Sequence, residues 1–343
     1  MSRCDFSIEW DKEAVFYVAE QASGKVHISV NQDTVCHKLS VRAEWRTHGR
    51  GNRDKGTLPI IEHTVSADKL IAGQSYTFPF NFTVSSGPLS YRGHYFNVDW
   101  YLKAVIDARG PFDPSYEQDF IVLPSVGQAA DPRFSGILSN IAKTNLGSRP
   151  SIFMGLFSLI FIGFGLFWFI FTRSVGNAPA FFPFFGLVFV VVGGILFYGN
   201  VRNFLAQQQL KDIKVELDKN ILIPDEAFTC NLSFNPSRNL TMQKVRFKLI
   251  GKEQVVSGSG TKRKTYTHNI FEGTETQLED SFIKAGESQT LSQLLHIPEN
   301  APYSFSAPDN KFIWQLEVVV DAKGVSNWVQ TYPLSVIPWK AEN

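Results

Sequence analysis

Residues 100–110 read WYLKAVIDARG and residues 314–324 read WQLEVVVDAKG, so one pattern occurs twice in the chain. In the first copy Trp100 and Leu102 fall on one face of a strand, because successive side chains of a strand point to opposite faces. In the second copy Trp314 and Leu316 fall on the equivalent face. Both stretches therefore predict a half-buried strand, with these four residues as its repeated core.

The repeat extends beyond these strands at a nearly constant offset. Residues 72–75 (AGQS) match residues 285–288 (AGES), and residues 122–124 (VLP) match residues 336–338 (VIP). Within each copy, alternating strands are separated by turn residues, a pattern typical of an antiparallel β-sandwich. We therefore predict an all-β chain with two tandem β-sandwiches.

The order of motifs also resembles a known family. An Ala-Gly pair precedes a strand, and residues 88–91 (PLSY) and 302–305 (PYSF) then lead into the tryptophan strands. This order resembles a lobe of the arrestin superfamily, over residues 5–125 and 211–338. The resemblance implies two sandwiches joined at a hinge, and adaptor or scaffold work that binds proteins and membranes without chemistry. Neither a Pro-Pro-x-Tyr motif nor an obvious clathrin-binding tail is found in the sequence.

The most apolar part of the chain lies between the two copies, where the resemblance would place the hinge. Residues 151–172 contain no charged side chain, and at about 1.5 Å per residue they cross a hydrocarbon core of roughly 30 Å. A second apolar stretch, residues 178–198, follows a short connection that holds Arg173. We predict a transmembrane helical hairpin; the alternative is a buried helical pair in a soluble protein. Because neither stretch offers an ionisable residue for a transport pathway, we interpret the hairpin as a tether.

The hairpin carries several glycines near heptad spacing, which allows two helix backbones to approach closely. They are Gly155, Gly163, Gly165, Gly186, Gly193 and Gly194. We expect them to pack the helices together; the alternative is that they reflect the general abundance of glycine in membrane helices.

The flanking charges predict the orientation, because positive residues favour the cytoplasmic side. Basic residues lie outside the hairpin on both sides: Arg133, Lys143, Arg149, Arg202, Lys211 and Lys214. Two spans return the chain to its starting side, so both termini and both lobes are predicted to be cytoplasmic. No export signal opens the chain. We therefore interpret the glycosylation sequons at Asn81, Asn231 and Asn239 as chance matches.

These observations divide the chain into five segments. Residues 1–125 form the first sandwich, 126–150 a linker, 151–200 the hairpin, 201–210 a juxtamembrane connector and 211–343 the second sandwich. In the linker, residues 132–143 (PRFSGILSNIAK) place apolar side chains at helical spacing. We expect this stretch either to lie in the membrane interface or to pack under the first lobe.

The composition argues against several classes of function. A formal net charge of +1 over 343 residues provides no field for nucleic acid. Cys4, Cys36 and Cys230 have no paired spacing, which fits a reducing compartment. We predict no enzyme, cofactor or metal, because the histidines are scattered and no catalytic motif occurs. Cys36 and its neighbour His37 would point to opposite faces of a strand, so they could not readily share an ion.

Each copy has one basic stretch that is a candidate contact with partners or anionic lipid. The first contains Arg46, Arg50, Arg53 and Lys55, and the second contains Lys262, Arg263 and Lys264. We expect both stretches in loops; the alternative is ordinary solvated hairpin tips.

The leading hypothesis is a membrane-anchored adaptor whose two cytoplasmic lobes bind protein partners at the membrane surface. The first rival is an obligate accessory subunit of a larger membrane enzyme or transporter, with the hairpin as its assembly surface. A third class is a hydrolase or ligand-binding enzyme built on a β-sandwich.

Overall fold

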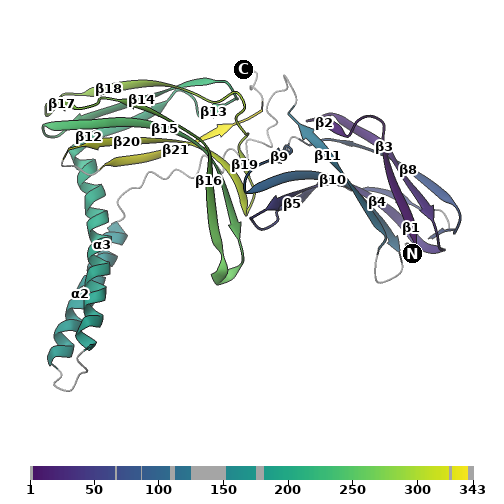
Figure 1. Cartoon of the computed structure of the whole chain (residues 1–343), viewed down its shortest axis with the longest axis horizontal. Coiled ribbons are helices and arrows are strands. Elements are labelled where there is room, and N and C mark those ends of the chain that lie inside the picture. Colours follow the sequence, from purple (N-terminus) through teal and green to yellow (C-terminus); the bar gives the residue numbers. More distant parts are fainter. Residues whose placement is uncertain are drawn as a thin grey trace.

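The computed structural model describes residues 3–65, 68–85, 87–108, 113–124, 152–174, 181–323 and 327–338. Two β-sandwich lobes make up most of the molecule, and a helical hairpin lies between them in the sequence (Figure 1). The prediction of an all-β chain with two sandwiches and a helical pair is thus confirmed. The expected linker and its helical stretch, residues 126–150, lie outside the described residues.

Lobe 1 packs a three-stranded sheet against an eight-stranded sheet. The smaller sheet has the order β1 (Cys4–Trp10), β3 (Gln21–Val30), β8 (Ser75–Thr83). The larger sheet has the order β2 (Val15–Tyr17), β11 (Ser115–Leu123), β10 (Phe96–Ala108), β4 (Thr34–Gly49), β5 (Lys55–Thr57), with β6 (Ile61–Thr64) and β7 (Lys69–Leu70) also on β4 and β9 (Tyr91–Arg92) on β10. Alternate residues fill the space between the sheets, and Trp100 and Leu102 are buried there.

Lobe 2 repeats this arrangement. Its smaller sheet has the order β12 (Leu210–Leu217), β14 (Ala227–Pro236), β18 (Gln289–His296). Its larger sheet has the order β13 (Ile221–Leu222), β21 (Trp328–Val336), β20 (Asn310–Ala322), β15 (Leu240–Ser257), β16 (Lys264–Gln277), with β17 (Ser281–Ile283) on β15 and β19 (Phe305–Ser306) on β20. Trp314 and Leu316 are buried in this core.

The tryptophan of each copy is held by the same hydrogen bond. Trp100 Nε1 donates to the carbonyl oxygen of Pro88 at 2.8 Å, and Trp314 Nε1 donates to that of Pro302 at 2.7 Å. The serine of each Pro-x-Ser motif accepts a bond of 2.9 Å from the closing strand, as Ser90 does from Val122 and Ser304 from Val336. The sequence repeat therefore reflects one structural unit used twice.

The two large sheets differ at one edge. In lobe 1 three short strands, β5, β6 and β7, pair in turn with β4. In lobe 2 the place of β5 and β6 is taken by β16, which pairs with β15 along its length apart from a bulge opposite Gly251 and Lys252, while β17 takes the place of β7. The resulting β15–β16 hairpin projects from lobe 2 on the same side as the two helices (Figure 1).

The helices α2 (Ile152–Ser174) and α3 (Phe182–Gln209) form an antiparallel pair, and α3 leads directly into β12. Small residues make the buried seam between them at heptad spacing: Ser158, Gly165 and Thr172 on α2, and Gly186 and Gly193 on α3. The seam hydroxyls are satisfied within α2, because Ser158 donates to the carbonyl of Gly155 and Thr172 to that of Trp168.

Three of the glycines permit this close approach. A methyl group on Gly165 would lie 2.6 Å from the carbonyl oxygen of Gly186, and one on Gly186 would lie 2.6 Å from that of Gly165. Gly193 is similarly close to the backbone of α2. The packing role is therefore confirmed for these three. Gly163 and Gly194 differ, since an added methyl group at either position would have no heavy atom within 4 Å.

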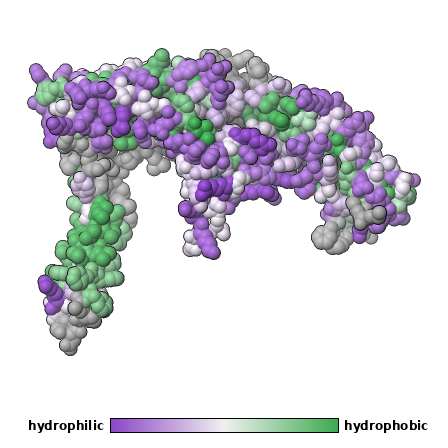
Figure 2. All heavy atoms as spheres, viewed as in Figure 1, coloured by the Kyte–Doolittle hydropathy of each residue, from purple (hydrophilic) through white to green (hydrophobic). Residues whose placement is uncertain are grey.

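One helix in the described part of the chain, Gly155–Ser174, is long and apolar enough to cross a membrane. The apolar part of α3, Phe182–Tyr198, is shorter, and the helix then continues to Gln209. Hydrophobic residues cover the middle of the helical pair in this view, whereas the lobes are mostly hydrophilic (Figure 2). Length and composition thus support the first of the two expected spans more strongly than the second.

Candidate interaction surface at the lobe junction

The corner between β9 and β10 of lobe 1 enters the core of lobe 2. Phe96 and Val98 are each 1% exposed and belong to the buried cluster of lobe 2. The ring of Phe96 stacks on Phe305 at 5.5 Å between centroids, and Tyr91 lies 5.8 Å from Phe312. Apolar burial therefore joins the two lobes.

A buried carboxylate anchors the same corner. Glu253 of β15 has no exposed surface, and it accepts hydrogen bonds from the Tyr91 hydroxyl at 2.8 Å, the His94 N–H at 3.0 Å and the Tyr95 N–H at 2.7 Å. Burial, together with the bond to Glu253, raises the pKa of Tyr91. No ion pair reaches Glu253 within the described ranges. The carboxyl group of Glu253 is thus satisfied by three donors from lobe 1, as a buried polar group requires.

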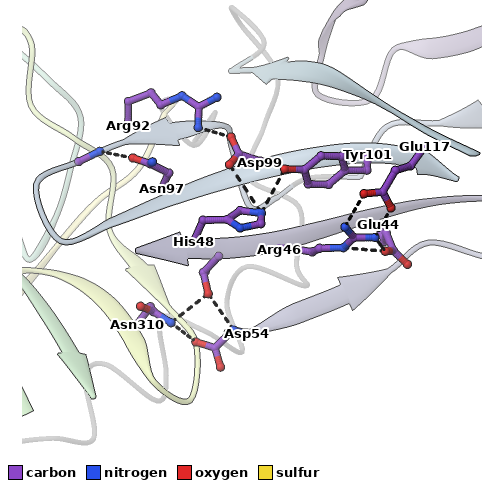
Figure 3. Close-up of polar contacts among 12 residues, drawn as sticks. Glu44, Arg46, His48, Asp54, Arg92, Asn97, Asp99, Tyr101, Glu117 and Asn310 are labelled. Carbon is purple, nitrogen blue, oxygen red and sulfur yellow. Dashed lines mark hydrogen bonds and ion pairs between the residues drawn. The ribbon is translucent and has the colours of Figure 1, made fainter. Parts of the chain in front are cut away.

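A second polar cluster crosses the junction beside β4 (Figure 3). The buried Asn310 side chain donates to Thr47 Oγ1 at 3.0 Å, to the Asn52 carbonyl at 2.7 Å and to Asp54 Oδ2 at 2.8 Å. Asp54 also accepts from the backbone N–H of Asp309 at 3.1 Å. Because these hydrogen bonds are buried and satisfied, they fix how the two lobes meet.

The loop before β5 is hydrogen-bonded to lobe 2 through the side chain and the backbone of Asn52. The Asn52 side chain donates to the carbonyl of Gly258 and accepts from its N–H, both at 3.0 Å, and the Asn52 N–H donates to the Val256 carbonyl at 2.8 Å. Gly51 makes this approach possible, since a methyl group there would lie 2.4 Å from Asn310 Oδ1.

Two residues of the first basic stretch, Arg46 and Arg50, are engaged in contacts within the protein. Arg46 lies within β4 and not in a loop; its guanidinium binds Glu44 and both oxygens of Glu117, at 3.0 and 2.7 Å. Its side chain is only 13% exposed. Arg50 lies over two rings, 3.7 Å from the centroid of Tyr266 and 5.2 Å from that of Tyr95.

The remaining basic residues are exposed. Arg53 and Lys55 belong to the first stretch, and Lys262, Arg263 and Lys264 to the second. Lys264 is already the first residue of β16, and the other two lie in the turn before it.

The two basic stretches converge on one ring. Arg263 pairs with Asp309 at 2.9 Å, and Lys264 lies 5.2 Å from the centroid of Tyr266, the ring that also carries Arg50. The proximity of the two basic stretches was not predicted, because no local sequence pattern indicates that two loops in different lobes are neighbours.

A polar chain covers the outer face of lobe 1 near the junction (Figure 3). The Tyr101 hydroxyl lies 3.1 Å from His48 Nε2, which is 3.8 Å from Asp99, and Asp99 pairs with Arg92. Burial lowers the pKa of His48, although Asp99 opposes this effect. The cluster faces solvent on the side of β4 opposite the buried core.

Glu253, Asn310 and the 91–96 corner were not predicted as junction residues. One signal was present: Glu253 alternates with Gly251 and Val255, two residues that lie on the core side of the sheet. The inward phase of β15 runs unbroken from Leu249 to Val255, because the bulge inserts its extra residue, Ile270, into β16. A glutamate was not expected at such a position, since carboxylates are seldom buried.

Cys36 and His37 lie on opposite faces of β4. Cys36 has no exposed surface, whereas the side chain of His37 is 40% exposed and pairs with Asp68 at 3.1 Å. Within the described residues no group of three or more histidine, cysteine, aspartate or glutamate side chains is arranged to hold a metal.

One family model matches lobe 2. Residues 208–336 match the family model described as the C-terminal domain of arrestin (or S-antigen). Among solved structures, the sporulation control protein Spo0M from Bacillus subtilis is similar, with 13% identity, a TM-score of 0.31 and coverage of 69% of this chain and 68% of that one. A search of curated proteins gives no match.

Proposed function

We propose that this arrestin-like chain is a membrane-anchored adaptor whose two lobes bind protein partners at one membrane surface. The observation that carries the proposal is the helical hairpin, which has a seam of small residues inside and large apolar side chains outside. Ile160 of α2 is 66% exposed and Ile195 of α3 is 67% exposed. Exposure of so large an apolar surface to water is unfavourable, whereas the same surface is stable in a bilayer.

The hairpin would cross the membrane twice. Its first span, Gly155–Ser174, suffices by length. The apolar part of α3 is shorter, and we propose that it spans the bilayer by staying packed against α2 along the glycine seam. The basic residues outside the hairpin then place both lobes and both termini on the cytoplasmic side. The segment boundaries at 125, 150, 200 and 210 belong to this proposal.

The junction gives the adaptor its geometry. Because Phe96, Glu253 and Asn310 bind the lobes to each other, the membrane hairpin at one lobe also positions the other. Confinement at a surface raises the effective concentration of both lobes for partners at the same membrane. We propose no catalytic step and no cofactor for this role.

We propose that the exposed basic residues supplement the anchor. The hairpin tip that holds Lys262, Arg263 and Lys264 projects on the same side as α2 and α3 (Figure 1). There it can meet anionic headgroups, each basic residue contributing about 1 kcal/mol when it reaches the surface. Arg46 and Arg50 are engaged within the protein, so we assign their main role to the fold.

The rival is an obligate subunit of a larger membrane assembly. It is favoured by Gly163 and Gly194, which leave small, open surfaces on the hairpin where a further helix could approach closely. Extraction in a gentle detergent followed by sizing separates the two, because an obligate subunit leaves the membrane with stoichiometric companions.

Two experiments test the adaptor itself. Protease added to sealed, right-side-out cells should leave both lobes intact, and digestion of either lobe would overturn the assigned topology. Replacing the hairpin by an unrelated two-helix tether of the same topology should preserve the co-purifying partners. Loss of every partner while both lobes remain folded would favour the subunit.

A further inference from the structure

β16 forms the outer edge of the larger sheet of lobe 2. It pairs with β15 from Lys264 opposite Ser257 to Gln277 opposite Val245, and no other described strand pairs with it. Its outer side therefore presents backbone N–H and C=O groups with no strand beside them in the described part of the chain. A long edge of this kind is a template for a further strand.

The edge is only partly protected, because a bulge at Ile270 and two glutamates interrupt a strand that is otherwise long. Natural edge strands are kept short, or carry proline or lysine, to prevent pairing with other chains. Lobe 1 follows this rule, because its corresponding edge is divided into β5 and β6, with Pro59 between them. After Lys264, β16 contains no proline, lysine or arginine. It is instead rich in threonine, which favours strands.

The register with β15 sorts the side chains of β16 into two rows. The row opposite inward residues of β15 consists of Tyr266, His268, Phe271, Gly273 and Glu275. The row opposite outward residues consists of Thr265, Thr267, Asn269, Glu272, Thr274 and Thr276. An added strand would therefore place apolar side chains beside the partly buried rings and the glycine, and polar side chains beside the threonines.

Two exposed glutamates of β16 favour a basic residue at one end of the added strand. Glu272 and Glu275 are exposed in the half of β16 far from the basic turn. Glu272 lies 3.9 Å from Lys248, whereas no ion pair to Glu275 occurs within the described residues. We propose that β16 docks an extended segment of a partner protein, with alternating apolar and polar side chains and a lysine or arginine beside Glu275.

A second copy of this chain fits the edge less well. Two identical strands that pair in antiparallel fashion are related by a two-fold axis perpendicular to them. The projecting part of the β15–β16 hairpin runs in the direction of α2 and α3 (Figure 1). Pairing two β16 strands in this way would point the two helical hairpins in opposite directions. One membrane could not hold both, so this step of the inference rests on the proposed function.

The test uses the full chain in detergent and a designed peptide of about eight residues. The peptide alternates valine and threonine and ends in lysine, and its control carries methyl groups on the backbone nitrogens. We expect the plain peptide to bind and to slow hydrogen exchange across residues 264–277. The methylated peptide should bind at least about tenfold more weakly, because it has lost its hydrogen-bond donors.

Two matched variants test the charge. Glu275→Lys should weaken peptide binding about three- to tenfold, whereas Glu279→Lys, two residues beyond β16, should leave it unchanged. Equal binding of the two peptides would overturn the inference, as would failure of the plain peptide to bind a chain whose exchange pattern shows β16 formed. Protection of β16 without peptide, in a particle of doubled mass, would assign the edge to a second copy. None of these outcomes bears on the topology, which the protease experiment decides.

Discussion

The carboxylate of Glu253 in lobe 2 accepts a hydrogen bond of 2.8 Å from the phenol of Tyr91 in lobe 1. Two backbone N–H groups of the same corner complete its coordination. Since the carboxylate is fully buried, a small displacement of the corner that admits no water would leave both the carboxylate and its donors unpaired. The junction therefore behaves as part of the folded core.

Removing this carboxylate should loosen the junction. Glu253→Ala leaves the Tyr91 hydroxyl and the N–H groups of His94 and Tyr95 without their acceptor, at about 1 to 3 kcal/mol for each buried unpaired group. We expect a lower unfolding midpoint in detergent and faster hydrogen exchange across residues 91–96. Glu275→Ala, at an exposed position of β16, is the control. Unchanged exchange at 91–96 in the Glu253 variant would mean that apolar contacts alone hold the corner.

The repeated tryptophans should be equally important to their own lobes. Trp100→Ala and Trp314→Ala each remove a fully buried ring and its bond to a proline carbonyl, at a cost of about 3 to 5 kcal/mol. That loss is comparable to the stability of a small domain. Hydrogen exchange should show that each substitution lowers the protection of backbone amides mainly in the lobe that carries it. Wild-type protection of both lobes in either variant would contradict the assignment of these rings to the cores.

The repeat, the strand phase and the helical pair could be predicted because each depends on local periodicity. Trp100 and Trp314 alternate with polar neighbours, and the uncharged run of residues 151–172 is long enough for a helix of several turns. The junction could not be predicted in this way. Glu253 and Tyr91 are 162 residues apart, and their contact depends on how two finished sandwiches meet.

The availability of the basic residues could not be predicted from local sequence either. Arg46 and Arg53 belong to one charged stretch of the sequence, yet Arg46 is held by Glu117, which lies 71 positions away. Only the pairing of β4, β10 and β11 brings that carboxylate beside the guanidinium. A run of positive charge in a sequence therefore does not show which of its members remain available to a partner.

His48 should give lobe 1 a pH dependence. Burial lowers the pKa of this histidine below its usual value of about 6.5, so the unfolded chain binds a proton more readily than the folded chain does. Stability contributed by the neutral imidazole is present above about pH 6.5 and is lost as the pH falls through that value toward the folded pKa. The unfolding midpoint of His48→Asn should vary less with pH than that of the parent. Parallel curves for the two proteins would exclude His48 as a cause.

The glycine seam of the hairpin offers a matched pair of variants. Gly165→Leu must force α2 and α3 apart, because even a methyl group there meets the Gly186 carbonyl oxygen at 2.6 Å. Gly163→Leu adds the same side chain to the same helix where nothing lies within 4 Å. We expect the first variant to lower the thermal midpoint in detergent and the second to leave it unchanged. If Gly163→Leu instead removes co-purifying membrane proteins, that glycine contacts another helix, as the accessory-subunit hypothesis requires.

The basic tip of the β15–β16 hairpin should lie close to anionic lipid. A fluorophore on Ser259→Cys can report this distance, because the native thiols are buried and burial raises the pKa of Cys36 to about 11 and that of Cys230 to about 12. In vesicles that contain phosphatidylserine, we expect energy transfer from the tip to labelled lipids, and a decrease as salt is raised. Replacing Lys262, Arg263 and Lys264 by serine should reduce the transfer, whereas Lys25→Ser on the small sheet of lobe 1 should not. Equal transfer in neutral and anionic vesicles would show that the tip is an ordinary solvated turn and that the hairpin helices alone hold the protein at the membrane.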